Sequence, residues 1–372
     1  MTDTAELDLD RSLDRLGRLV ATESPSGHVP GLEGCYELLT EWTRDLLAAP
    51  RRVVEDGVPH LYWEERAPAP GGRTVLLLGH ADTVWPCGTI DDWPYGIDGD
   101  RVTGPGVFDM KAGLVLAVDA LALAGDVDHV RMLVTGDEER GSLTSRGLVE
   151  EAAKGCAAVL VLEPSLDGAV KTARKGGAFY RLNVKGHAAH SGLEPELGVN
   201  ALVELAHQVL AIAALGDEEL GTSVTPTVAG AGTTTNTVPA HASVDVDVRA
   251  WHRRELERVE RDLRRLRSRV PGTEFTLTGG VNRLPLEHAM SAELFGTARR
   301  LAEAGGLPAL GEAAVGGASD GNFTAAMGIP TLDGLGPRGD GAHARHEWVD
   351  AGSLRGRAAL VAGLIQAVGT GT

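Results

Sequence analysis

The stretch Val75-Leu76-Leu77-Leu78-Gly79-His80-Ala81-Asp82 joins an apolar run directly to a histidine and an aspartate. The run Val75–Leu78 has the length and composition of a strand that is buried on both faces. Side chains alternate along an extended chain, so His80 and Asp82 point the same way. We interpret Asp82 as the residue that holds the ring of a metal-binding His80. A histidine in a solvated loop is the alternative.

Helices and strands alternate on both sides of this stretch. Up to residue 168 we predict helices around Leu9–Val20 and Leu38–Leu46, a strand over Thr74–Gly79, a helix over Lys111–Ala124, a strand over Val130–Thr135, a helix over Ser145–Lys154 and a strand over Ala157–Leu162. Such alternation is typical of a doubly wound, mixed α/β sheet. Functional sites in these folds gather at the carboxyl ends of the strands.

The pattern changes after Gly168, where half-exposed alternation replaces fully apolar runs. We predict strands over Ala178–Val184 and Ala242–Arg249, helices over Val199–Ala214 and Arg253–Arg269, and then, in the first style again, a helix over Ser291–Ala304, a strand near Ile329 and a helix over Ser353–Val368. The sequence therefore predicts two domains. Residues 175–285 form a small α+β insertion, and residues 1–174 and 286–372 together form the other domain.

Composition restricts the class of protein. The 372 residues suffice for about two domains. With 23% charged and 43% apolar residues, the composition is that of a soluble globular protein. The formal net charge of −17 argues against a nucleic-acid partner or an anionic membrane surface.

Cysteine usage and the first residues bear on location. Cys35, Cys87 and Cys156 are widely spaced and contain no C-x-x-C, so they suggest neither a disulfide framework nor a zinc knuckle. Met1–Glu6 lacks the basic start and apolar run of a signal peptide, and no stretch approaches the roughly 18 apolar residues of a membrane span. We therefore expect a cytoplasmic protein without a membrane partner.

Acidic residues follow or precede the predicted elements of the first domain. Asp109 stands in a glycine-rich turn just before the helix that starts at Lys111, where a helix N-cap is the alternative reading. Glu138 and Glu139 follow the strand that ends at Thr135 and face different ways, with a solvated acidic turn as the alternative.

Two further loops complete the set. Glu163 ends an apolar run, where an unpaired charge would be costly, so its carboxylate needs a cation. The glycine-rich segment 339–347 supplies His343 and His346, and on composition alone either could be a ligand.

Two histidines and several carboxylates form a ligand set suited to zinc, cobalt or manganese. One shared carboxylate would allow two ions about 3.5–4 Å apart. A further carboxylate that is not a ligand is then needed as general base, and Glu138 beside Glu139 offers one of each.

Several motifs, in order along nearly the whole chain, resemble those of the co-catalytic di-zinc peptidases and deacylases. This family includes carboxypeptidase G, the aminoacylases, acetylornithine deacetylase and succinyl-diaminopimelate desuccinylase. The motifs are Gly79-His80-Ala81-Asp82-Thr83-Val84, Gly104-Pro105-Gly106-Val107-Phe108-Asp109-Met110-Lys111-Ala112-Gly113, Asp137-Glu138-Glu139-Arg140-Gly141-Ser142, Leu162-Glu163-Pro164, Lys185-Gly186-His187-Ala188-Ala189-His190-Ser191-Gly192, Asn236-Thr237-Val238-Pro239 and Gly341-Ala342-His343.

The resemblance implies a ligand for each position of a two-zinc site. Asp109 would bridge the two ions. His80 and Glu163 would complete the first site, and Glu139 and His343 the second. His343 rather than His346 matches the family position.

It also implies roles for residues that hold no metal. Glu138 would be the general base that takes a proton from the bridging water, and Asp82 would orient the histidine before it. In the insertion, which matches the family's lid and usual dimerisation domain, His190 would steady the oxyanion, in many members within the partner's site. Asn236 and Arg249 would hold the substrate's free carboxylate.

Glu163 and the segments 137–142 and 195–201 most resemble carboxypeptidase G. The resemblance thus implies a homodimeric hydrolase that acts on a small peptide or N-acyl amino acid and releases glutamate or a similar acidic residue. Deacylation of an N-acetyl or N-succinyl amino acid, or hydrolysis of a specialised biosynthetic amide, are alternatives. A non-catalytic metal-binding scaffold is the alternative from another class.

Overall fold

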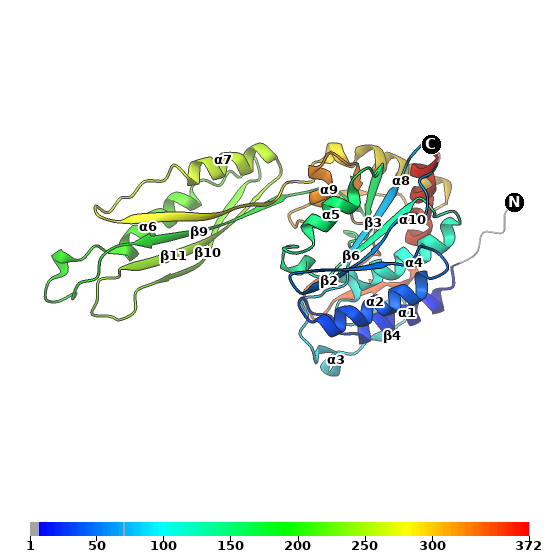
Figure 1. Cartoon of the computed structure of the whole chain (residues 1–372), viewed down its shortest axis with the longest axis horizontal. Helices are drawn as coiled ribbons and strands as arrows, with labels where there is room; N and C mark the ends of the chain where they lie inside the picture. Colours follow the sequence, from blue (N-terminus) through cyan, green and yellow to red (C-terminus); the bar gives the residue numbers. More distant parts are fainter. Residues whose placement is uncertain (1–6, 70, 372) are drawn as a thin grey trace. The chain divides into compact units, whose positions relative to one another are not determined.

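The computed structural model describes residues 7–69 and 71–371. Met1–Glu6, where we expect no signal peptide, lie outside the described residues. Within those two ranges, no helix is both long and apolar enough to cross a membrane. The chain divides into two compact units, coloured by sequence in Figure 1. Unit 1 comprises the described parts of Met1–Ala173, Glu287–Val315 and Ser319–Thr372, and unit 2 comprises Arg174–Leu286 and Gly316–Ala318.

Unit 1 is built on a mixed sheet with the strand order β1-β2-β6-β3-β7-β14. Its strands are β1 (Arg51–Glu55), β2 (Val58–Trp63), β3 (Val75–His80), β6 (Val130–Thr135), β7 (Ala158–Val161) and β14 (Thr331–Leu332). Strand β3 runs parallel to β6 and β7, and β14 runs parallel to β7. Strand β2 is antiparallel to both β1 and β6. The predicted α/β class with a mixed sheet is confirmed.

Both faces of this sheet are covered, which is why the first four residues of β3, Val75–Leu78, are all apolar. Val75 and Leu77 pack into one core, while Leu76 and Leu78 pack into the core on the opposite face. The first core includes α1 (Leu9–Ala21), α2 (Val29–Thr43), α4 (Ala112–Ala124), α8 (Ala292–Ala304) and α10 (Ala351–Thr370), and the second includes α5 (Arg146–Ala153) and α9 (Gly321–Ala326). Figure 1 shows α5 and α10 on opposite sides of the sheet.

The parallel strands end at one edge of the sheet. Register pairs His80 of β3 with Thr135 of β6, and Leu78 of β3 with Val161 of β7. The segments that leave these ends lie side by side for that reason. The remaining elements of the first part of the chain and of the C-terminal part are α3 (Thr89–Asp92), β4 (Gly96–Asp98), β5 (Arg101–Thr103), β8 (Val170–Arg174), β13 (Glu312–Val315), β15 (Gly339–Asp340) and β16 (Trp348–Asp350).

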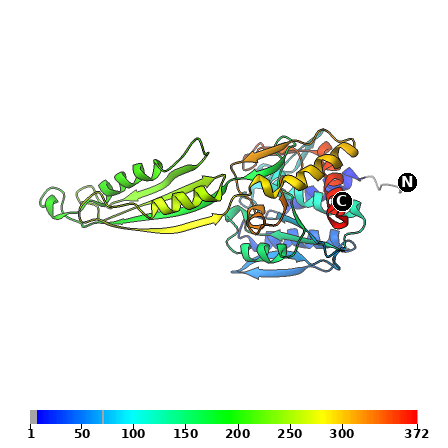
Figure 2. The same cartoon turned by 90° about the horizontal axis from the view of Figure 1, so that it is seen from above.

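Unit 2 is an antiparallel sheet covered by helices on one face. The strand order is β10-β11-β9-β12. Its elements are β9 (Gly176–Lys185), α6 (Ala201–Ala213), β10 (Ser223–Ala231), β11 (His241–Ala250), α7 (Arg253–Leu263) and β12 (Glu274–Arg283). Alternate residues of β9 and β11 pack against both helices, whose place beside the strands can be followed in Figure 2.

Two details of unit 2 differ from the expectation. The helix predicted over Arg253–Arg269 ends at Leu263. Strands β10 and β12 were not predicted. In β10, Val224 is the buried residue of a segment that is otherwise half-buried or exposed, so its apolar periodicity is weak.

Candidate metal centre

His80 is the last residue of β3, and its side chain is only 2% exposed. Nδ1 of the ring lies 2.9 Å from the backbone carbonyl oxygen of Asp82. A carbonyl can only accept, so Nδ1 carries a proton and Nε2 is the atom that faces the neighbouring carboxylates. The Asp82 carboxylate is farther from Nδ1, at 3.5 Å. Asp82 therefore contacts the ring mainly through its main chain.

The carboxylate of Asp82 holds a different part of the site. It is fully buried and accepts hydrogen bonds from Oγ of Ser26 at 2.5 Å and from the backbone N–H groups of Glu138 and Glu139, both at 3.1 Å. These bonds fix the turn that carries the two glutamates. No local pattern in the sequence predicts these two backbone contacts, because the partners lie 56 and 57 residues apart.

Asp109 lies between two histidines. Its Oδ1 is 3.3 Å from Nε2 of His80, and its Oδ2 is 3.4 Å from Nε2 of His343. On the His80 side, Oε1 of Glu163 lies 3.5 Å from the same Nε2. On the His343 side, Oε2 of Glu139 lies 3.1 Å from Nε2. The structure thus brings the five predicted ligands together as two groups that share one carboxylate.

The spacing of these nitrogen and oxygen atoms suits a shared metal ion better than it suits direct hydrogen bonds between the side chains. Among the described residues, His80 Nε2 and Asp109 Oδ1 are buried without a hydrogen-bond partner, although they lie 3.3 Å apart. Ligands held tetrahedrally at about 2.0–2.1 Å from a zinc ion lie about 3.3 Å from one another. The group of His80, Asp109 and Glu139 and the group of His80, Glu138 and Glu163 each offer ligand atoms within 4.8 Å of one another.

Without a metal, protons take up the charge of this cluster. Burial disfavours the charged form of Asp109, but the two neighbouring histidines, His343 and His80, hold the pKa of its carboxyl well below the usual range. Asp109 and Glu139 raise the pKa of His343 to about 10. So many buried carboxylates require positive charge beside them, and a metal ion would replace the two ring protons.

His343 adopts a backbone conformation that is uncommon for its residue type. Its φ of 63° lies in the left-handed region, which costs a non-glycine residue about 1–3 kcal/mol. Such strain is typical of functional positions. His346, the other candidate from the sequence, is exposed, and its backbone carbonyl accepts a hydrogen bond from Arg101 at 3.2 Å.

Glu347 holds the backbone beside Asp109 in place, and the sequence did not predict this role. Its side chain is fully buried, and Oε1 accepts hydrogen bonds from the backbone N–H groups of Phe108, at 2.8 Å, and Asp109, at 3.0 Å. Oε2 accepts from the N–H of Gly106, at 3.1 Å, and from Nε1 of Trp85, at 2.9 Å. Burial raises the pKa of Glu347 to about 7 despite these donors. Glu347 therefore ties the turn before α4 to the loop of the second histidine.

His190 and Asn236 lie side by side within unit 2. Nδ1 of His190 accepts hydrogen bonds from the backbone N–H groups of Gly192 and Leu193, both at 3.1 Å. The neutral ring therefore carries its proton on Nε2, and His190 is exposed. The backbone carbonyl of Asn236 accepts from Ser191 N–H at 2.9 Å, which holds the two predicted residues in adjacent segments.

Arg249 lies elsewhere in unit 2. Its Nε and Nη2 each donate to the carboxylate of Asp247 at 2.9 Å. Arg249 stands eight residues after His241, the first residue of β11, and at about 3.3 Å per residue this corresponds to about 26 Å. His190 and Asn236 precede that first residue in the chain. The structure therefore places Arg249 toward the opposite end of the strand from the other two.

Solved structures share this fold. Aminopeptidase PepT from Bacillus cereus aligns with a TM-score of 0.77 and 23% identity, covering 97% of this chain and 99% of that one. The M20 family metallo-carboxypeptidase Sso-CP2 from Sulfolobus solfataricus aligns with a TM-score of 0.74 and 18% identity, covering 97% and 100% of the two chains. At sequence identities this low, the structural similarity shows a shared fold alone.

Relatives in sequence point the same way. Carboxypeptidase G2 from Pseudomonas sp. (strain RS-16) is 32% identical over 313 residues, which cover 81% of this chain and 75% of the relative. Succinyl-diaminopimelate desuccinylase from Magnetococcus marinus is 27% identical over 295 residues, which cover 70% and 75%. Residues 76–367 match the description "Peptidase family M20/M25/M40". The chain belongs to this family of metallopeptidases and is a carboxypeptidase-like hydrolase.

Proposed function

We propose that this chain is a two-metal hydrolase that cleaves the amide bond of a C-terminal or N-acylated amino acid and releases glutamate. The position of Asp109 between His80 and His343 is the observation on which the proposal rests, because a carboxylate that presents one oxygen to each histidine suits two ions. The similarity to carboxypeptidase G2 supports carboxypeptidase-like cleavage, and glutamate is proposed as the released residue because the motifs of the sequence resemble those of carboxypeptidase G.

The proposed ligands follow the two groups of contacts. His80, Asp109 and Glu163 would hold one ion, and Asp109, Glu139 and His343 the other. Zinc suits these nitrogen and carboxylate ligands, and cobalt or manganese would also bind them. Bound ions would polarise the amide carbonyl and lower the pKa of water.

Glu138 is the proposed general base. Its carboxylate lies within 4.8 Å of ligand atoms of His80 and Glu163, while its backbone N–H is held by Asp82. In this role Glu138 takes a proton from the water that attacks the carbonyl carbon. It then gives that proton to the amide nitrogen as the C–N bond breaks, so that a carboxylate and an amine are released.

Unit 2 supplies the proposed substrate-binding groups as a lid and dimerisation domain over residues 175–285. The Nε2–H of His190 would donate to the oxyanion of the tetrahedral intermediate. Asn236 and Arg249 would bind the free carboxylate of the substrate. Arg249 and His190 lie toward opposite ends of β11. This separation favours a homodimer in which the two residues of one chain serve different active sites.

Deacylation of an N-acyl amino acid is the second candidate. The similarity to succinyl-diaminopimelate desuccinylase favours it, because an N-succinyl and a peptide amide require the same centre. The two functions differ in the acyl group that is accepted.

Glu138→Gln tests the proposed mechanism. The variant keeps the size of the side chain but removes the base, so turnover of an N-acyl glutamate should fall by about 10²–10⁴-fold, while metal content measured by atomic emission stays the same. Glu151→Gln, an exposed position on α5, is the matched control. Retained turnover in the Glu138 variant would exclude Glu138 as the base. A second experiment distinguishes the two functions. It compares the rates at which the enzyme hydrolyses N-acyl glutamates, N-acetylornithine and an N-succinyl amino acid, and identifies the products of each reaction.

A further inference from the structure

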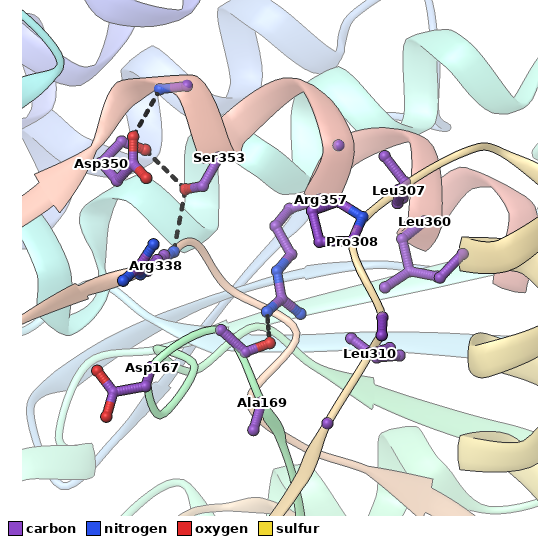
Figure 3. Close-up of a pocket in the computed structure, with 16 residues that line it drawn as sticks. Asp167, Ala169, Leu307, Pro308, Leu310, Arg338, Asp350, Ser353, Arg357 and Leu360 are labelled. Atoms are coloured by element: carbon purple, nitrogen blue, oxygen red, sulfur yellow. Dashed lines mark hydrogen bonds between the residues drawn. The ribbon is translucent and has the colours of Figure 1, made fainter.

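Unit 1 contains a pocket that shares no lining residue with the metal centre. It has a volume of about 520 Å³ and lies between the start of α10, the loop 307–311 and the turn 167–169 (Figure 3). This volume is within the range of small-molecule sites. Much of the wall is apolar and consists of Ala302, Leu307, Pro308, Ala309, Leu310 and Leu360.

A buried arginine lines this pocket. Arg357 of α10 is only 7% exposed, and its Nη2 donates to the backbone carbonyl of Gly168. Among the described residues, Nη1 of Arg357 is buried and has no hydrogen-bond partner. Figure 3 shows the guanidinium between Ala169 and Leu310, where it faces the apolar wall.

The charge of Arg357 is not compensated by a carboxylate in the described part of the chain, and burial lowers its pKa to about 10. The guanidinium therefore remains protonated at neutral pH. An uncompensated charge in an apolar setting is costly unless a counter-ion binds. Arg131 shows the usual arrangement in this protein, because its Nε and Nη2 donate to the carboxylate of Glu65 at 2.5 and 2.7 Å.

The other charged residues of the pocket limit which anion would fit. Asp350 accepts a hydrogen bond from Gly352 N–H at 3.0 Å, which caps α10. Asp167 and Arg338 are exposed. Because these two exposed charges are opposite and Arg357 has one open nitrogen, a single negative charge is better matched than the multiple charge of a phosphate.

We propose that this pocket binds a small organic carboxylate with an apolar body. The carboxylate accepts from Nη1 of Arg357, and the apolar body packs against Leu307, Pro308, Leu310 and Leu360. Arg338 lies in the same lining and adds positive charge at the exposed side. The site is independent of the proposed hydrolysis, since none of its residues belongs to the metal centre.

Benzoate binding to the zinc-loaded full chain, measured by calorimetry, tests the proposal, with benzamide as the neutral probe of the same shape. Arg357→Met removes the charge but keeps much of the side-chain volume, and should weaken benzoate binding by about ten- to a hundredfold. Arg355→Met, which changes the same charge at an exposed position of the same helix, should leave it unchanged. Binding of benzoate at the metal centre would persist in both variants, so the difference between them reports on this pocket.

Equal benzoate affinity in the Arg357 and Arg355 variants would overturn the proposal. So would the lack of any Arg357-dependent binding of benzoate or hexanoate, which would show that the pocket holds water only. If Arg357→Met does not fold, photo-crosslinking of the wild-type chain with para-benzoylbenzoate decides. Labelling within residues 302–311 or 353–360 that benzoate suppresses and benzamide does not supports the site, and labelling elsewhere contradicts it.

Discussion

Asp109 connects the two halves of the candidate centre at the scale of single residues. Each of its oxygens faces a different histidine, so its loss affects both groups of ligands at once. His343, by contrast, contacts Asp109 and Glu139 but belongs to one group only. We therefore expect that replacing Asp109 and replacing His343 will lower the metal content of the protein by different amounts.

Asp109→Asn should lower the content of both ions, because the shared carboxylate loses a charge and one acceptor oxygen. His343→Ala should lower the content by one ion per chain and leave the His80 group able to bind. Metal-to-protein ratios after dialysis against limiting zinc measure both effects. If the two variants lose the same amount of metal, the assignment of Asp109 as a shared ligand is wrong.

Three of the candidate ligands stand beside elements that the sequence predicts, because His80 ends an apolar strand, Glu163 follows one and Asp109 precedes a helix. The full set of five candidate ligands, with Glu139 and His343, came from the resemblance to a known family. The supporting contacts could not be predicted. Glu347 binds the N–H groups of Phe108 and Asp109 from more than 200 residues away. No local pattern encodes such a contact, since it depends on how distant segments pack.

Helix α7 is a secondary-structure element whose end could not be predicted from the local sequence. Charged residues with one apolar face continue past Leu263, so the sequence alone predicts a longer helix. In the structure the helix ends at Leu263, and farther along the chain Glu204 of α6 accepts hydrogen bonds from the backbone N–H groups of Arg269, at 2.8 Å, and Val270, at 2.7 Å. The buried carboxylate competes with helix continuation for these donors.

Glu204→Gln should therefore destabilise unit 2 by about 1–3 kcal/mol, because an amide cannot replace a carboxylate that accepts from several donors. Burial raises the pKa of Glu204, but hydrogen bonds from Val270, Gln208 and Arg269 outweigh it and lower the pKa below its usual value. A lowered folded pKa contributes stability at neutral pH that is lost as the pH falls through the folded value. Hydrogen exchange of residues 264–273 measures the effect.

The difference between wild type and Glu204→Gln should shrink as the pH falls below the ordinary glutamate pKa of about 4.3 and then through the lowered pKa of folded Glu204. Glu257→Gln is the control, since Glu257 forms an exposed ion pair with Arg253 on α7. A difference that stays constant down to acid pH would show that Glu204 acts through packing alone.

At the scale of the whole molecule, unit 2 exposes apolar side chains that a monomer would leave in water. Leu193 is 74% exposed, Leu210 of α6 is 73% exposed and Val228 of β10 is 64% exposed. Strand β10 is also an edge of its sheet. Exposed apolar residues beside an unpaired edge are typical of surfaces that associate, which supports the proposed homodimer.

Val228→Glu should weaken this dimer, because it places a charge on the edge strand. Val54→Glu is the matched control, since Val54 is 44% exposed on β1, an edge strand of unit 1. Sedimentation velocity should show more monomer for Val228→Glu and an unchanged distribution for Val54→Glu. A dimer that tolerates charge at Val228 and dissociates with charge at Val54 would place the interface in unit 1.

The pairing of β14 with β7 joins a strand that the ribosome makes early to a strand that it makes near the end of the chain. Unit 2 is almost continuous, so its sheet can form as soon as residues 174–286 have emerged. Strand β7 is made earlier but presents an unpaired edge until Thr331–Leu332 arrives. His343 and Glu347 emerge later still. The nascent chain therefore exposes an aggregation-prone edge while residues 162–330 are made, and the proposed metal centre can be completed only when translation is nearly finished.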